Sequence, residues 1–144
     1  MVDHDVLVVG GGPVGLLLAC LVAQDGRRVR VYERRTDQGT QTRAIGIHRP
    51  GLDALDAAEV GTEVRSEALR LSGGEVRSRG RRLVALTFPS ERPILTLAQP
   101  RTEELLRDRL RALRPDALQS GRTVRSLRDE GPFVRVGIDD EHGC

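Results

Sequence analysis

Val6-Leu7-Val8-Val9-Gly10-Gly11-Gly12-Pro13-Val14-Gly15 is the stretch that decides the fold of this 144-residue chain. Its first four residues are apolar and mainly β-branched, which is typical of a strand buried on both faces of a parallel sheet. Three glycines follow, and Pro13 then suits the first turn of a helix. The stretch predicts a strand, a tight turn and a helix in direct succession.

The residues after this stretch complete a βαβ unit. The predicted helix has an apolar face at helical spacing, made of Val14, Leu17, Leu18, Leu21 and Val22. Gly26 stands where a helix stops, and Val29 to Glu33 reads as a second strand. Because crossovers between parallel strands are right-handed, the handedness of the unit is also expected.

The remainder of the chain alternates helical and extended patterns. After a polar loop over residues 34–47, we expect a short helix over 50–58 closed by Gly61, antiparallel strands within 75–97, a helix over 101–113, a short strand over 117–119, and two strands over 122–127 and 133–138. A turn signal, Asp129-Glu130-Gly131-Pro132, joins the last two strands. No return strand follows them, so they are expected to keep an unpaired edge.

The glycines have the spacing G-x-G-x-x-G of a phosphate-binding turn. Gly10 would make the tight turn, Gly12 would let a pyrophosphate approach the backbone, and Gly15 would let the helix pack on the strand. The phosphates would bind free N–H groups at the positive end of the helix.

Glu33 lies 18 positions beyond Gly15, close to the roughly 20 expected for an acid that binds ribose hydroxyls. A carboxylate there would repel a 2′-phosphate, so the site favours FAD or NAD over NADP. The alternative is a structural turn followed by a solvated acid.

Three segments carry a resemblance that separates FAD from NAD. They are residues 5–35 with Gly-Gly-Gly-Pro, the stretch Arg43-Ala44-Ile45-Gly46-Ile47-His48, and Leu97-Ala98-Gln99-Pro100-Arg101 leading into Glu104-Leu105-Leu106. In these the chain resembles the FAD-dependent aromatic monooxygenases of the para-hydroxybenzoate hydroxylase type. The resemblance implies an α/β, Rossmann-like FAD-binding fold with a parallel sheet plus antiparallel β segments.

The resemblance also implies roles for single residues. Arg43 would reach the FAD pyrophosphate or the flavin edge, and Gln99 would hydrogen-bond the cofactor from the strand before the second long helix. Arg34 would cover the adenine or face water, and the backbone of Val124 would line the adenine pocket. The predicted cofactor-binding residues are therefore Gly10, Gly12, Pro13, Val14, Gly15, Glu33, Arg34, Arg43, Gln99 and Val124. The sequence assigns no catalytic residue and no metal site.

The activity implied is hydroxylation of an aromatic or polyketide-like small molecule with NAD(P)H and dioxygen. A related FAD-dependent reductase, dehydrogenase or halogenase is an alternative, as is a truncated or split-gene nucleotide-binding fragment without activity. The later Asp-Gly and Gly-Asp motifs of the family are absent. We therefore expect residues 1–144 to be one incomplete, truncated FAD-binding domain, the N-terminal portion of a larger flavoprotein. Alone it would not be catalytically competent, and a second chain or the missing C-terminal part would complete it.

Composition argues against a nucleic-acid-binding, membrane or secreted protein. All 23 basic residues are arginines interleaved with 21 acids, and only three residues are aromatic, which argues against a nucleic-acid interface. The first apolar helix is too short to span a membrane. The acidic N-terminus does not look like a signal peptide, and the two cysteines form no metal or redox pattern. These features favour a cytoplasmic protein.

Overall fold

The βαβ unit lies where the sequence predicts it. The computed structural model describes residues 3–37, 46–91 and 93–140, and its first elements are β1 (Val6–Val9), α1 (Pro13–Gln24) and β2 (Val29–Glu33). β1 and β2 pair in parallel, from Val6 opposite Val29 to Val9 opposite Tyr32. β8 (Leu118–Ser120) pairs in parallel with the other side of β2, so the strand order is β1-β2-β8. The predicted α/β class is confirmed.

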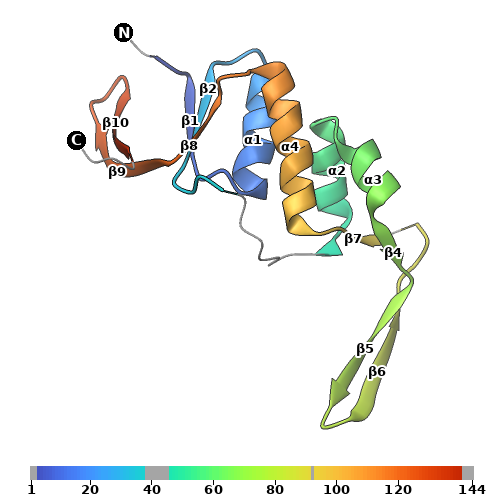
Figure 1. Ribbon diagram of the computed structural model, residues 1–144. Helices are drawn as coiled ribbons and strands as arrows, with labels where there is room; N and C mark the ends of the chain where they lie inside the picture. Colours follow the sequence, from blue (N-terminus) through green and yellow to red (C-terminus); the bar gives the residue numbers. More distant parts are fainter. Residues whose placement is uncertain (1–2, 38–45, 92, 141–144) are drawn as a thin grey trace.

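This sheet lies between two other layers (Figure 1). α1 and α4 (Gln99–Leu113) cover one face, and the hairpin of β9 (Arg122–Asp129) and β10 (Val134–Asp140) lies on the other. The core includes Val8, Val31, Leu16, Leu106 and Leu110, all nearly inaccessible to solvent. Within the described residues β10 pairs only with β9, which agrees with the expected unpaired edge.

The buried face of α1 agrees with the prediction in part, since Leu17, Leu21 and Val22 are partly buried against the core. Val14 and Leu18 are 79% and 47% exposed, whereas the face against the sheet and α4 consists of Leu16, Ala19, Cys20 and Ala23. Because α1 is apolar on nearly every side, its periodicity does not identify the inner face. Small side chains allow a close approach of neighbouring elements and therefore lie inside.

The segment between the two long helices contains elements that the sequence did not predict. α2 (Arg49–Ala57) is followed by α3 (Gly61–Glu67), so Gly61 begins a helix instead of closing one. The left-handed residue after α2 is Glu59, with φ of 61°. An ion pair between Arg65 and Asp56 joins α3 to α2. α3 is too short to show a helical period, and its buried residues are Gly61 and Val64.

Short strands connect these helices to the rest of the chain. β3 (Gly46–Ile47), β7 (Ile94–Thr96) and β4 (Leu69–Leu71) form a small antiparallel sheet in the order β3-β7-β4. β3 ends the stretch that the sequence predicted as loop, and two residues are too few to give a strand pattern. β5 (Gly73–Ser78) and β6 (Arg81–Thr87) form a hairpin that projects away from the body (Figure 1). All residues of β6 are exposed.

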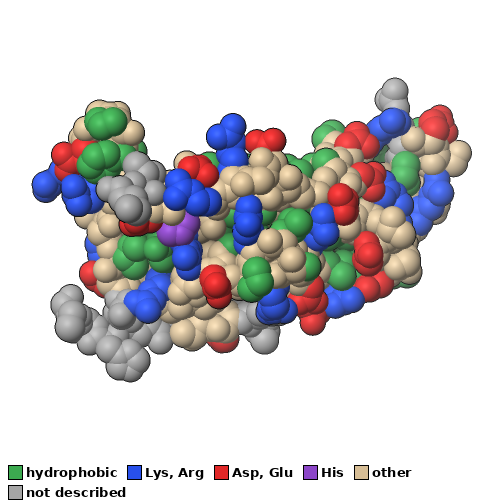
Figure 2. Space-filling model, turned by 90° about the horizontal axis from the view of Figure 1, so that it is seen from above, with side chains coloured by type: hydrophobic (Ala, Val, Ile, Leu, Met, Phe, Trp, Pro, Cys, Tyr) green, Lys and Arg blue, Asp and Glu red, His purple; other side chains and the backbone are tan. Residues whose placement is uncertain are grey.

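Charges of both signs are spread over the surface. Figure 2 shows arginine and acidic side chains interspersed on the face it presents, with no continuous basic stripe there. No helix in the described parts of the chain is long and apolar enough to cross a membrane.

Candidate cofactor site

The glycine turn is fixed at both ends by backbone contacts. Gly10 leaves β1 with φ of 106°, a conformation that residues with a Cβ rarely adopt. Its N–H donates to the carbonyl oxygen of Tyr32 at 2.8 Å. A Cβ added to Gly15 would lie 2.0 Å from the carbonyl oxygen of Gly10, so only glycine lets α1 begin this close to β1. Both structural roles expected from the motif are present.

Gly12 leaves the N-terminus of α1 open. A Cβ built on Gly12 would meet no atom within 4 Å, and no side chain caps the helix. The first N–H bonded within the helix is that of Leu16, which donates to Gly12 at 2.9 Å. The earlier N–H groups of a helix have no intrahelical acceptor, and the helix dipole is positive at this end. The turn therefore has the space, donors and potential that a pyrophosphate requires.

Glu33 faces the turn from the end of β2 and is 8% exposed. Its Oε2 accepts a hydrogen bond from the Gly11 N–H at 2.6 Å. Its Oε1 accepts from the Arg35 N–H and Nε at 3.0 and 3.2 Å. Burial raises the pKa of Glu33, but the hydrogen bonds from Arg35 and Gly11 outweigh this effect and leave the pKa below its usual value. Glu33 is therefore an ionised acceptor beside the turn, as binding of ribose hydroxyls requires.

Gly11 and Arg35 are contacts that the sequence reasoning missed. A Cβ on Gly11 would lie 3.0 Å from the Cβ of Glu33, so the middle glycine makes room for the acid. Arg34 and Arg35 are both exposed, and of the two it is Arg35 whose ion pair with Glu33 is recorded. The spacing of two residues between Glu33 and Arg35 is the signal that could have predicted this contact.

The predicted roles of Val124 and Arg43 at the cofactor stay predictions. Val124 is half-buried in β9 and pairs with Ile138 of β10. Arg43 lies outside the described residues, so its predicted contact with the cofactor stays a prediction.

Gln99 is the first residue of α4 and does not belong to a strand, which corrects the sequence-based expectation. Proline is favoured in the first turn of a helix, so Pro100 supports a start two residues before the predicted one. Gln99 lines an apolar cleft of about 160 Å³ together with Pro13 and Val14 of α1. The cleft brings predicted residues from both helices together beside the glycine turn.

A row of polar side chains continues from Gln99 along α4. The Gln99 Nε2 donates to Glu103 at 2.8 Å, and the Arg107 Nη2 donates to Glu103 at 3.1 Å. The same Nη2 lies 3.4 Å from the carbonyl oxygen of Gly11. Spacing of four residues places all three on one helix face, which is the signal that could have revealed the row. The row links α4 to the glycine turn.

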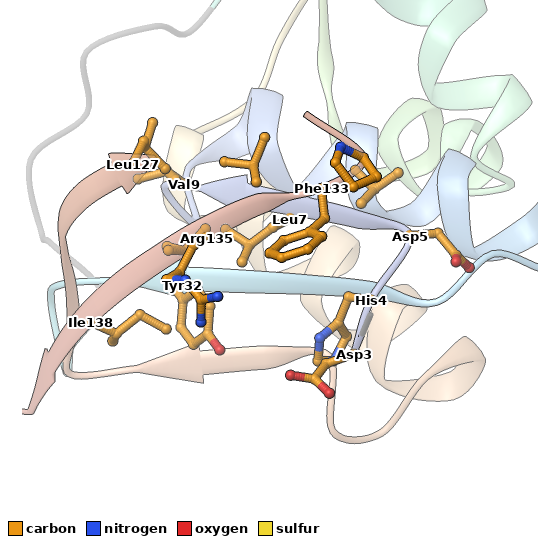
Figure 3. A pocket seen from close by; sticks show the side chains of 14 residues that line it. Asp3, His4, Asp5, Leu7, Val9, Tyr32, Leu127, Phe133, Arg135 and Ile138 are labelled. Carbon is orange, nitrogen blue, oxygen red and sulfur yellow. The ribbon is translucent and has the colours of Figure 1, made fainter. Parts of the chain in front are cut away.

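A larger cavity lies on the opposite face of the parallel sheet. It measures about 910 Å³ and is lined by residues of β1, β2 and the β9–β10 hairpin (Figure 3). Leu7, Tyr32, Leu127 and Phe133 line it. It contains none of the predicted cofactor-binding residues, and the chemistry expected of a phosphate site is found at the glycine turn.

A strand, an open glycine turn on a helix N-terminus and an ionised acid on the next strand together define a dinucleotide-binding protein. The comparison with known families gives the particular class. Residues 3–143 match the model of the FAD binding domain family, and the chain belongs to this family. The resemblance inferred from the sequence and the expectation of FAD are thereby confirmed.

Curated relatives include monooxygenases from Streptomyces. The chain is 34% identical over 141 residues to 12-dehydrotetracycline 5-monooxygenase/anhydrotetracycline 6-monooxygenase of Streptomyces rimosus, a match that covers 97% of this chain and 28% of that protein. It is 32% identical to rifampicin monooxygenase of Streptomyces venezuelae, with 94% of this chain and 29% of the relative covered. The chain thus spans less than a third of the length of these two relatives.

Solved structures agree in fold. The p-nitrophenol 4-monooxygenase of Pseudomonas putida superposes with a TM-score of 0.87 at 25% identity, covering 97% of this chain and 37% of that one. The anhydrotetracycline hydroxylase of Streptomyces rimosus gives 0.83 at 33% identity, covering 97% and 29%. Aklavinone-11 hydroxylase, solved with FAD and aklavinone, gives 0.79 at 27% identity, covering 99% and 31%.

Proposed function

We propose that this chain is the FAD-binding portion of a flavin-dependent monooxygenase that hydroxylates an aromatic or polyketide-like substrate with NAD(P)H and dioxygen. The arrangement of Glu33 against the open glycine turn is the observation that carries the proposal, because it presents an ionised acceptor and free backbone donors to one dinucleotide. The names of the relatives, which act on tetracyclines, rifampicin and p-nitrophenol, support the substrate class.

The residues of this chain would hold the adenosine diphosphate half of FAD. Gly10, Gly12, Pro13, Val14 and Gly15 would form the pyrophosphate site, with Glu33 on the ribose. Arg34 and the Val124 backbone would border the adenine. Arg43 and Gln99 would contact the cofactor nearer the flavin. When bound, FAD would supply the redox chemistry, and the protein would orient the cofactor and keep water from it.

We propose further that residues 1–144 are one FAD-binding domain completed by additional polypeptide, either a second chain or a C-terminal part. The relatives' greater length supports this, and so do the apolar side chains left exposed on β10 and the β5–β6 hairpin. The isolated chain would bind FAD without turnover. We also propose a cytoplasmic location, in line with the sequence features described above.

The direct test is to purify the chain, add FAD or NAD, remove free nucleotide and record the visible absorption. A yellow protein with stoichiometric flavin supports the proposal. A folded chain that retains NAD and not FAD would contradict it. Adding NAD(P)H anaerobically then separates binding from activity, because the isolated chain is expected to leave the flavin oxidised.

A further inference from the structure

The row of polar residues on α4 ends at the glycine turn. Gly11 is held from two directions, since its N–H donates to Glu33 and its carbonyl oxygen accepts from Arg107. The Arg107 side chain is 12% exposed and the Glu103 side chain 7%. Two charged residues are thus buried between α4 and the turn, where a leucine or methionine would pack at no cost in desolvation.

One nitrogen of the buried Arg107 guanidinium has no hydrogen-bond acceptor among the described residues. Its Nη1 is buried and has no hydrogen-bond partner among the described residues. A buried donor without an acceptor destabilises a fold. Packing of one helix against another does not require this arrangement, so the orientation of Nη2 toward Gly11 needs a separate reason.

The geometry of the peptide bond supplies the reason. The bond between Gly11 and Gly12 is trans, so its C=O and N–H point in opposite directions. A guanidinium that holds the Gly11 carbonyl toward α4 turns the Gly12 N–H away from α4. Within the described residues no acceptor contacts that N–H, and it lies at the open end of α1.

We propose that Arg107, held in place by Glu103, is a positioning residue that orients the Gly11–Gly12 peptide so that the Gly12 N–H donates to the pyrophosphate of the bound dinucleotide. The inference rests on the proposed FAD site and adds a residue from a helix outside the glycine motif. The Arg107 Nη2 lies 3.4 Å from the Gly11 carbonyl oxygen, at the long end of hydrogen-bond distances, and its proposed role is to orient the peptide and not to contact the ligand.

The test compares ADP, which carries the pyrophosphate, with adenosine, which does not. Both are titrated by NMR against wild type, Arg107→Met and Arg107→Lys, with thermal melting to confirm folding. Arg111→Met is the matched control, because Arg111 lies one turn further on α4, is 67% exposed and pairs with Asp108.

Arg107→Met is expected to lower ADP affinity about tenfold, the scale of one hydrogen bond to a charged group, with adenosine affinity unchanged within twofold. Arg107→Lys keeps the charge but loses the planar fork, so ADP affinity should fall by a smaller factor. Arg111→Met should change neither ligand.

An unchanged ADP affinity in the folded variants, or a parallel loss of ADP and adenosine, would overturn the inference. If Arg107→Met does not fold, the same comparison is made with Arg107→Lys, and wild-type ADP affinity there overturns it. Wild-type chain that binds neither FAD nor ADP would instead contradict the proposed function, and with it this inference.

Discussion

The Gly11 N–H donates a hydrogen bond of 2.6 Å to Glu33, across 22 positions of the sequence. The contact joins the glycine turn to the carboxyl end of β2. It means that the acid is oriented before any ligand arrives. The carboxylate that stabilises the turn is therefore the same one that is proposed to bind the nucleotide.

Replacing Glu33 by alanine should weaken binding of ADP and FAD by about 1–3 kcal/mol, because a charge-assisted hydrogen bond to the ribose is lost. The change also leaves the Gly11 N–H without its acceptor, so the free energy of unfolding should fall as well. Calorimetry and urea unfolding measure the two effects. Asp53→Ala, at an exposed position of α2, is the control and should alter neither. Unchanged nucleotide affinity in Glu33→Ala would remove Glu33 from the site.

Acid should destabilise the chain through carboxylates whose pKa values are lowered in the folded state. Hydrogen bonding to Arg28 lowers the pKa of Asp5 to about 2, and the pKa of Glu33 is also below its usual value. Such groups stabilise the fold fully above their unfolded pKa values, near 4, and the contribution disappears as the pH falls through the folded values.

Urea unfolding from pH 7 to pH 2 should show this loss. Glu33→Gln should be less stable than wild type at pH 7, and the difference should shrink toward pH 2. Salt should reduce the contribution of the exposed Asp5–Arg28 pair more than that of Glu33. A difference between wild type and Glu33→Gln that is constant with pH would contradict the lowered pKa.

Replacement of Gly15 or of Gly12 by alanine should affect different properties, the first stability and the second ADP affinity. Gly15→Ala forces a methyl group against the Gly10 carbonyl and should cost about 1–3 kcal/mol of stability or more. Gly12→Ala meets no protein atom, so the chain should fold normally. Its methyl group would occupy the space proposed for the pyrophosphate, and ADP affinity should fall. Thermal melting and ADP titration of both variants distinguish the roles. Equal melting temperatures for the two variants would contradict the prediction, because they would mean that the turn accommodates the methyl group of Gly15→Ala.

Cys20 should be unreactive in the folded chain. Burial raises the pKa of its thiol to about 11, and its Sγ donates to the carbonyl oxygen of Leu106. In a Cys144→Ser variant, a thiol reagent at pH 8 should label Cys20 only as fast as α1 separates from α4. The same variant in urea should react at once. Rapid labelling of the native protein would mean that this helix interface opens freely.

Prediction from the sequence was most accurate where residues close in the chain determine the backbone conformation. The bounds of β1 and β2 were predicted correctly because Gly10 ends β1 and Gly26 separates α1 from the strand that follows. Glu33 follows from the same geometry. These residues depend on contacts within one βαβ unit.

The predictions that failed depend on distant neighbours. α3 and β3 are too short to show a period, and each forms against other segments. Val14 and Leu18 were wrongly placed on the packed face of α1 because an evenly apolar helix carries no directional signal. Arg107 was missed because its partner at the turn lies 96 positions away, and only the fold brings the two together.

The β5–β6 hairpin has a consequence for handling the protein. Among the described residues its two strands pair only with each other, and a two-stranded ribbon is at most marginally stable in water. Its turn, at Arg79 and Gly80, is rich in the arginines after which trypsin cleaves. Brief digestion should therefore cut this ribbon first and leave α1 and α4 intact. Protection of the same bonds in a mixture with other polypeptides would then report which of them covers the ribbon.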